Sequence, residues 1–252
     1  MNGPLLVIDA STYRGTVAIV DADRILAENE AQMRGADAER LMPAVATVLS
    51  DAGVTVSDLA GIVCGEGPGS FTSLRIAASI AKGLSVAADR PLYAVSSLLL
   101  IVAAAPPPLA SGGYLALLDA MRGEWFGMRV DVADLDVVAV DAEPTLMDAS
   151  MIARVVPDEQ RIAVGPGQAL DLAPRAAGAA RLLGRRVPRL DGGGRDTESG
   201  EPSSSAAATP ASHTGDVQLV HPVDRTTWEP LYGRLAEAQV KWEKLQGRPL
   251  VV

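Results

Sequence analysis

The sequence predicts an α/β fold made of two lobes, and three observations indicate it. The first half of the chain alternates short apolar strands with amphipathic helices, as α/β architectures do. A stretch rich in proline and glycine, residues 105–113, interrupts this pattern, and a second set of strands follows it. The chain of 252 residues is 48% hydrophobic, which is enough for a sizeable core.

The first lobe, expected over residues 1–104, opens with a three-stranded meander. Leu5–Asp9 is a short, β-branched apolar run that ends in polar side chains, and Thr16–Val20 is a second such run. A turn at Asp21–Asp23 leads into a third strand, Arg24–Glu30. Two further strands are expected at Leu59–Cys64 and Leu92–Ser96.

Two helices are expected between these strands. Apolar residues recur at three- and four-residue steps over Ala38–Ala52, with Asp37 as the N-cap and Gly53 as the stop signal at C′. The second helix is expected over Thr72–Ala88, after the glycine-rich turn GEGPGSF. Few charges interrupt this helix, so it must be covered on more than one side.

The linker at residues 105–113 leads into a second lobe, expected over residues 114–190. Its strands are expected at Tyr114–Asp119, Glu124–Val132 and Val137–Val140, and residues 120–123 join the first two. Residues 191–216 have too little apolar content to offset the entropy of ordering, and we expect an insert there. Residues 217–252 end in an amphipathic helix over Trp228–Gln246 that packs back on the body.

Composition limits the classes of function. A net charge of −9 opposes independent capture of RNA or DNA, so a nucleic-acid role is expected to go through a partner. A single cysteine, Cys64, forms no internal disulfide and no multi-thiolate metal site, and a reducing compartment fits. The sequence shows neither a signal peptide nor an apolar run long enough to span a bilayer, so a cytoplasmic protein without membrane contact is expected.

Two stretches are candidates for phosphate binding. VIDAST delivers Asp9 from a strand into a polar turn with Ser11 and Thr12, and backbone amides near Gly67 and Gly69 precede a helix. The spacing of GEGPGSF matches neither a P-loop nor a dinucleotide fingerprint, since no lysine follows its glycines. The alternative interpretation, a β-turn and a tight turn between strand and helix, remains open.

Catalytic constellations are scarce. His213 lies in the expected insert and His221 just beyond it, so a Ser-His-Asp triad or a histidine metal centre is not expected. Cys64 has no basic neighbour in sequence and is expected to be a buried structural thiol. The carboxylates are scattered, and no catalytic acid and base pair is assigned.

The two helices of the first lobe present broad apolar faces. Together they are expected to offer half of a four-helix bundle to a second protein. The alternative is that both faces are internal core of this chain. Small residues on the second helix permit close approach. The residues expected to contact a partner are Leu41, Met42, Val45, Leu49, Leu74, Ala77, Ile80, Ala81 and Leu84.

Several segments resemble the bacterial TsaB (YeaZ) family. They are LLVIDAST, DAERLMPAVATVLSDAGV, VCGEGPGSFTSLRIAASIAKGL and RPLYAVSSL, followed by LLDAMRGEWFG, VGPGQAL and EPLYGRLAEAQVKWEKL. The resemblance covers most of residues 4–188 and 226–246. The chain departs from the family pattern at Asp37, where His is common, and at Ser73 and Ala77, where Gly is common.

The resemblance implies an actin-like ATPase fold (ASKHA, ribonuclease H-like) and a noncatalytic role in tRNA threonylcarbamoyladenosine (t6A) modification. It further implies direct binding to the catalytic subunit TsaD, helix to helix, in an assembly with the ATPase TsaE, and contact with tRNA only through that complex. Ser97 and Ile101 stand where the catalytic relative has its two metal-binding histidines, so no metal is expected. Nucleotide affinity (ATP or ADP) at Asp9, Ser11, Thr12, Gly67 and Gly69 is expected to be weak or lost, and no cofactor is required.

Two alternatives stay open at this point. One is an enzyme, either a nucleotide hydrolase that uses Asp9 and the glycine turn or a peptidase of the same fold. The other is a homodimer that pairs the same two helices when TsaD is absent, because exposed apolar faces tend to associate.

Overall fold

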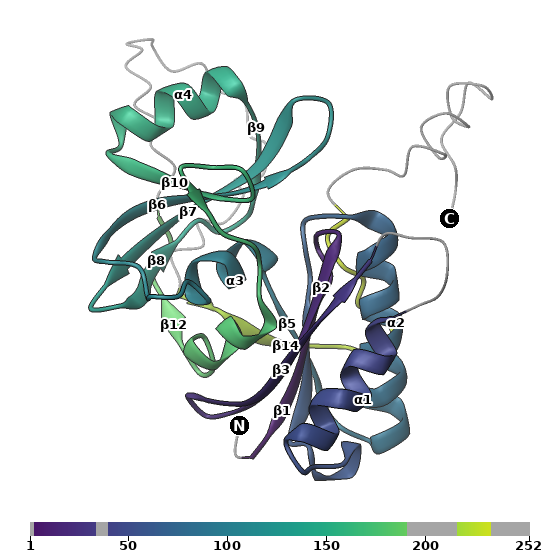
Figure 1. Ribbon diagram of the computed structural model, residues 1–252. Coiled ribbons are helices and arrows are strands. Elements are labelled where there is room, and N and C mark those ends of the chain that lie inside the picture. Colours follow the sequence, from purple (N-terminus) through teal and green to yellow (C-terminus); the bar gives the residue numbers. More distant parts are fainter. Residues whose placement is uncertain (1–2, 34–39, 191–215, 233–252) are drawn as a thin grey trace, which may run out of the picture.

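The computed structural model describes residues 3–33, 40–190 and 216–232, and in it the chain forms two lobes, each built on a mixed β-sheet (Figure 1). The first sheet has six strands in the order β14-β5-β4-β1-β2-β3. Their bounds are β1 (Leu5–Asp9), β2 (Arg14–Asp21), β3 (Arg24–Gln32), β4 (Gly61–Gly65), β5 (Leu92–Val95) and β14 (Val220–Val223). The expected meander is confirmed, since β1, β2 and β3 pair antiparallel in sequence order.

The second sheet repeats the pattern of the first. Three antiparallel strands, β6, β7 and β8, are extended by the parallel strand β10, as β1 to β3 are extended by β4. The bounds are β6 (Gly112–Asp119), β7 (Glu124–Ala133), β8 (Asp136–Val140), β9 (Thr145–Asp148), β10 (Arg161–Gly165) and β11 (Leu170–Asp171). The repetition makes the two lobes related, and the expected α/β, actin-like fold is confirmed.

Helices α1 (Leu41–Asp51) and α2 (Phe71–Ala88) lie side by side on one face of the first sheet (Figure 1). The expected start of α2 is confirmed to within one residue. After α1, Gly53 adopts a φ of +68°, its N–H bonds the Ser50 carbonyl, and the Val54 N–H bonds the Leu49 carbonyl, which is a Schellman stop. The expected cap Asp37 lies outside the described residues.

Helix α3 (Ser97–Ala103) lies between the two sheets, and the sequence interpretation missed it. All seven of its residues are buried, in a core shared by strands of both lobes. The 3-10 helix η2 (Ala176–Arg181) packs beside it, and the Ala176 N–H donates to the Thr16 hydroxyl of β2 over 2.9 Å. The interface between the lobes is therefore part of the core.

The remaining elements of the described residues are one α-helix, one 3-10 helix and two short strands. Helix α4 (Ala149–Asp158) covers the outer face of the second sheet, and Asp148 caps it by accepting from the Met151 N–H over 2.8 Å. The others are η1 (Val56–Asp58), β12 (Arg186–Val187) and β13 (Val217–Gln218).

The C-terminal segment returns to the first lobe, because β14 pairs with β5. The expected helix from Trp228 is not present over residues 228–232, which are irregular, and the rest of that helix lies outside the described residues. The insert expected at residues 191–216 is also outside them, except for Asp216. Residues 105–111, within the expected linker, have no helix or strand, and β6 begins at Gly112.

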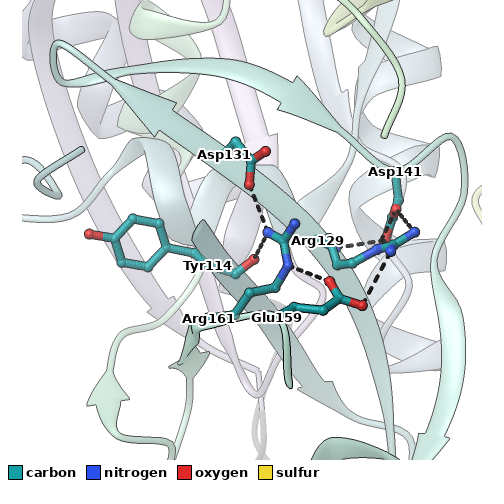
Figure 2. Close-up of polar contacts among 6 residues, drawn as sticks. All are labelled: Tyr114, Arg129, Asp131, Asp141, Glu159 and Arg161. Atoms are coloured by element: carbon teal, nitrogen blue, oxygen red, sulfur yellow. Dashed lines mark hydrogen bonds and ion pairs between the residues drawn. The ribbon is translucent and has the colours of Figure 1, made fainter. Parts of the chain in front are cut away.

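A chain of alternating charges ties β7, β10 and the end of α4 together (Figure 2). Arg161 bonds Asp131 over 2.7 Å and Glu159 over 2.8 Å, and Arg129 bonds Asp141 over 2.8 Å and Glu159 over 3.4 Å. The Arg161 side chain is only 9% exposed and also donates to the Tyr114 carbonyl. Each arginine bridges two acids, so we assign these groups to stability of the second lobe.

Replacing Arg161 with alanine should lower the free energy of unfolding by about 2 kcal/mol, because a largely buried ion pair loses one partner. Urea unfolding measures the change. Arg154→Ala, at an exposed position of α4, is the matched control and should stay within about 0.5 kcal/mol of the wild type. Equal stability of the Arg161 variant and the control would contradict the assignment.

Candidate functional site

The structure divides the nine residues expected to contact a partner into two groups. Leu41, Val45, Leu74, Ala77 and Ala81 are buried in the chain's own first lobe, each with no exposed surface. Side chains without exposed surface have nothing to offer a partner, so this part of the expectation is corrected. Of the other four, Met42 is 40% exposed and Leu49, Ile80 and Leu84 are partly buried.

Most residues on the exposed surface of α1 and α2 do not belong to the apolar pattern from which the partner contacts were predicted. On α2 the exposed positions recur at three- and four-residue steps, which places them in one stripe. On α1 the exposed positions follow the same spacing. We call this surface the docking face, and it comprises Met42, Pro43, Ala46, Thr47, Ser50, Asp51, Thr72, Arg75, Ser79, Gly83, Val86 and Ala87.

The docking face is unusual for a helical surface. Val86 is 62% exposed and Met42 is 40% exposed, while most of the other side chains are small. Its charged members are Arg75 on α2 and Asp51 at the end of α1. Exposed helix surfaces ordinarily carry many charges, so this composition suits a surface that another helix pair covers closely. The sequence interpretation missed this surface, because small and polar residues do not form an apolar pattern.

The glycine turn is closed by the chain itself. A Cβ on Gly69 would lie 2.2 Å from the Ser11 carbonyl oxygen, and one on Gly67 would lie 2.6 Å from the Leu231 carbonyl oxygen. The Ser70 N–H donates to the Ser11 carbonyl over 2.7 Å. The glycines therefore permit close packing of backbone on backbone, which favours the interpretation of Gly67 and Gly69 as a packing turn.

Asp9 lies at the end of β1 and is fully buried. Its carboxyl group accepts hydrogen bonds from the Ser97 hydroxyl, from the Ser11 hydroxyl over 2.8 Å and from the Ser11 N–H over 3.1 Å. Burial raises the pKa of Asp9 above its ordinary value, against the hydrogen bonds, which lower it. Ser97, at a position where the resemblance places a metal-binding histidine of the catalytic relative, thus completes an internal polar network with Asp9 and Ser11.

Asp9→Asn is expected to leave stability at pH 7 unchanged or higher. A raised pKa in the folded state means that the contribution of Asp9 to stability is present at low pH and is lost as pH rises through the folded pKa. The difference in unfolding free energy between the variant and the wild type should therefore grow in favour of the variant from acid to neutral pH. Urea unfolding at a series of pH values measures this, and an opposite trend would contradict the network.

A cleft of about 940 Å³ lies between the lobes. Of the residues expected to bind nucleotide, only Thr12 lines it, together with Tyr13, Arg14 and Ile101. Arg14 forms an ion pair with Glu30 over 3.2 Å, and Arg175 pairs with Glu28. The cleft therefore has polar walls whose two arginines are already matched by acids, and Asp9, Ser11, Gly67 and Gly69 do not line it.

Cys64 and His221 behave as structural groups. Cys64 is fully buried, and burial raises the pKa of its thiol, which keeps it protonated. His221 on β14 lies 3.5 Å from Glu66 at the start of the glycine turn, and the hydrogen bond to Glu66 raises the pKa of His221. Within the described ranges, no group of three or more His, Cys, Asp or Glu side chains is arranged to hold a metal ion.

A strap that the sequence interpretation did not foresee runs along α2. We call residues 224–232 the strap. Arg225 bonds Asp89 over 3.1 Å at the C-terminal end of α2, Glu229 bonds Lys82 over 2.8 Å, and Tyr232 reaches Phe71 at the N-terminal end. The Leu231 N–H also donates to the Glu66 carbonyl over 2.7 Å. The strap covers one flank of α2 and contacts the docking face at Arg75, through the Tyr232 ring.

None of the helices among the described residues is long and apolar enough to cross a membrane.

Sequence comparisons match this chain to proteins of tRNA threonylcarbamoyladenosine modification. The family model described as TsaD, tRNA N6-adenosine threonylcarbamoyltransferase, matches residues 31–152. The chain is 39% identical over 94 residues to the tRNA threonylcarbamoyladenosine biosynthesis protein TsaB of Bacillus subtilis, a match that covers 37% of this chain and 41% of that protein. It is 33% identical over 120 residues to the TsaB protein of Escherichia coli, covering 48% of this chain and 52% of the relative.

The matched stretch thus spans about half the length of these curated relatives. Among solved structures, YeaZ from Pseudomonas aeruginosa superposes with a TM-score of 0.63 at 28% identity, and the match covers 73% of this chain and 91% of that one. The structural match therefore extends over both lobes, whereas the sequence matches cover about half of the chain or less.

Proposed function

Because the chain belongs to the TsaB (YeaZ) family, we propose that it acts in tRNA threonylcarbamoyladenosine biosynthesis as a noncatalytic subunit that binds the catalytic subunit TsaD. The ATPase TsaE completes the assembly, and tRNA is reached through the complex. The observation that carries the proposal is the docking face, an exposed and almost uncharged surface on two adjacent helices. A standard interface there would bury roughly 1,200 to 2,000 Å² in total.

Two features of the site support the noncatalytic role. Asp9, the candidate carboxylate, is enclosed and hydrogen-bonded to Ser97. The glycine turn is filled by the strap and by Ser11. The alternative of a nucleotide hydrolase relies on these same groups, so their burial supports the noncatalytic role over that alternative.

The cytoplasmic location expected from the sequence belongs to this proposal, since tRNA modification takes place where tRNA is found. Self-association through the docking face is expected when TsaD is absent, because the exposed Val86 and Met42 would otherwise stay in water.

Reconstitution tests the function. Purified cognate TsaD and TsaE should modify tRNA efficiently only when this chain is added, and the chain alone should leave tRNA unmodified. Asp9→Asn should support the reaction as well as the wild type does. Modification by the chain alone, or full modification without it, would overturn the proposal.

A further inference from the structure

Arg75 stands out on the docking face because it is held in place from two sides. Its guanidinium carbon lies 4.1 Å from the centroid of the Phe71 ring and 5.2 Å from that of Tyr232. The two rings are themselves in contact, with centroids 4.8 Å apart. Cation–π contacts of this kind fix an arginine side chain while its N–H donors remain available.

The two charged residues next to Arg75 on this side of α2, Lys82 and Glu229, pair with each other. Glu229 of the strap accepts from the Lys82 ammonium over 2.8 Å and from the Tyr232 hydroxyl over 2.6 Å. Among residues 3–33, 40–190 and 216–232, no carboxylate forms an ion pair with Arg75. The Tyr232 hydroxyl also forms a hydrogen bond with Arg75, and the nearby Glu229 carboxylate, which interacts with Arg75, already pairs with Lys82. Within the described residues two cations thus face one acid, which leaves one positive charge for another molecule.

The residues around Arg75 indicate which chemical group the partner must present to it. Ser79, Gly83 and Val86 continue the stripe on which Arg75 lies and carry no charge, so a protein that covers them strips water from the guanidinium as well. An arginine that loses water without gaining an acceptor weakens binding strongly, whereas a carboxylate can accept two parallel N–H bonds from it.

We propose that Arg75 is the anchor for an acidic side chain of the protein that covers the docking face, and that Phe71 and Tyr232 hold the guanidinium ready for it. This inference rests on the proposed function. It adds a chemical requirement on the partner, namely an Asp or Glu within a neutral, closely packed helical surface. A protein carboxylate fits better than an RNA phosphate, because the docking face carries no cation besides Arg75 and the chain carries a net charge of −9.

Calorimetric titration of the full chain into purified TsaD tests the proposal. Arg75→Ala should raise the Kd about 30-fold, the size of an interface hot spot. Arg75→Lys keeps the charge without the planar fork and should recover only part of the affinity. Arg154→Ala, an exposed arginine on α4, is the control and should bind like the wild type.

The salt dependence of TsaD binding distinguishes a charge pair at Arg75 from a packing effect. Binding of the wild type should weaken more steeply with added NaCl than binding of Arg75→Ala does, because the variant has lost the pair that salt screens. Thermal melting of each variant, expected to match the wild type, shows that folding is unaffected.

The outcomes distinguish this inference from the function on which it rests. If Arg75→Ala binds TsaD within threefold of the wild type while Val86→Asp does not bind, the docking face stands and the carboxylate anchor is overturned. If both variants bind like the wild type, the proposed interface itself fails. Loss of RNA binding by the assembled complex, with unchanged affinity for TsaD, would also overturn the anchor and assign Arg75 to phosphate.

Discussion

Aspartate at Val86 is expected to weaken TsaD binding by at least about 100-fold, because a carboxylate would be buried without a partner in a closely packed helical contact. Val86 is 62% exposed in the free chain, so the same change should leave the free energy of unfolding within about 1 kcal/mol of the wild type. Titration of the variant into TsaD and urea unfolding of the free variant measure the two effects.

Leu74→Asp, in contrast to Val86→Asp, is expected to act on folding and not on the interface. Leu74 has no exposed surface and packs beneath the same helix, so an aspartate there must bury a charge and should unfold the first lobe. Its loss of binding would be a consequence of unfolding and says nothing about the interface. A stable, TsaD-binding Val86→Asp variant would contradict the docking face.

Gly69→Ala is expected to lower the free energy of unfolding by about 3 kcal/mol, the cost of a methyl group forced against fixed backbone together with a lost hydrogen bond. The added Cβ would lie 2.2 Å from the carbonyl oxygen and 2.7 Å from the Cα of Ser11. The turn must then move away from β1 and break the bond between the Ser70 N–H and the Ser11 carbonyl. Urea unfolding measures the loss.

Gly83→Ala is the matched control, since a Cβ at Gly83 meets no atom within 4 Å. Alanine in the middle of an exposed helix should raise the free energy of unfolding by about 0.5 to 1 kcal/mol. If Gly69→Ala proved as stable as this control, the turn would be open enough to accept a ligand and its interpretation as a packing turn would fail.

Local signals in the sequence were sufficient for much of the first lobe. Short β-branched runs and a tight turn specify β1 to β3, and the change to a three- and four-residue period specifies α1. The glycine turn marks the start of α2. Helix α3 escaped this approach because its seven residues are buried all round, so no period marks which face is inside. Short apolar runs of that length fit a strand as well as a helix.

The candidate site depended on contacts that no local pattern contains. The apolar side chains of α1 and α2 indicated a wide hydrophobic face, yet Leu74 and Ala77 rest on the chain's own sheet. The closed state of the glycine turn follows from Leu231, which is remote in sequence. Likewise, Tyr232 reaches Phe71 only because β14 returns the chain to the first lobe.

The central claim is that TsaD covers the exposed face of α1 and α2, and cysteine labelling tests it most directly. The single native thiol, Cys64, is fully buried, so a cysteine introduced at Ala46 or Gly83 would be the reactive one. Cysteine at Ala153, an exposed position on α4, serves as the control. The account predicts that saturating TsaD slows maleimide labelling at positions 46 and 83 at least about tenfold and leaves position 153 unaffected. Unchanged labelling at positions 46 and 83 in a complex that has demonstrably formed would contradict it.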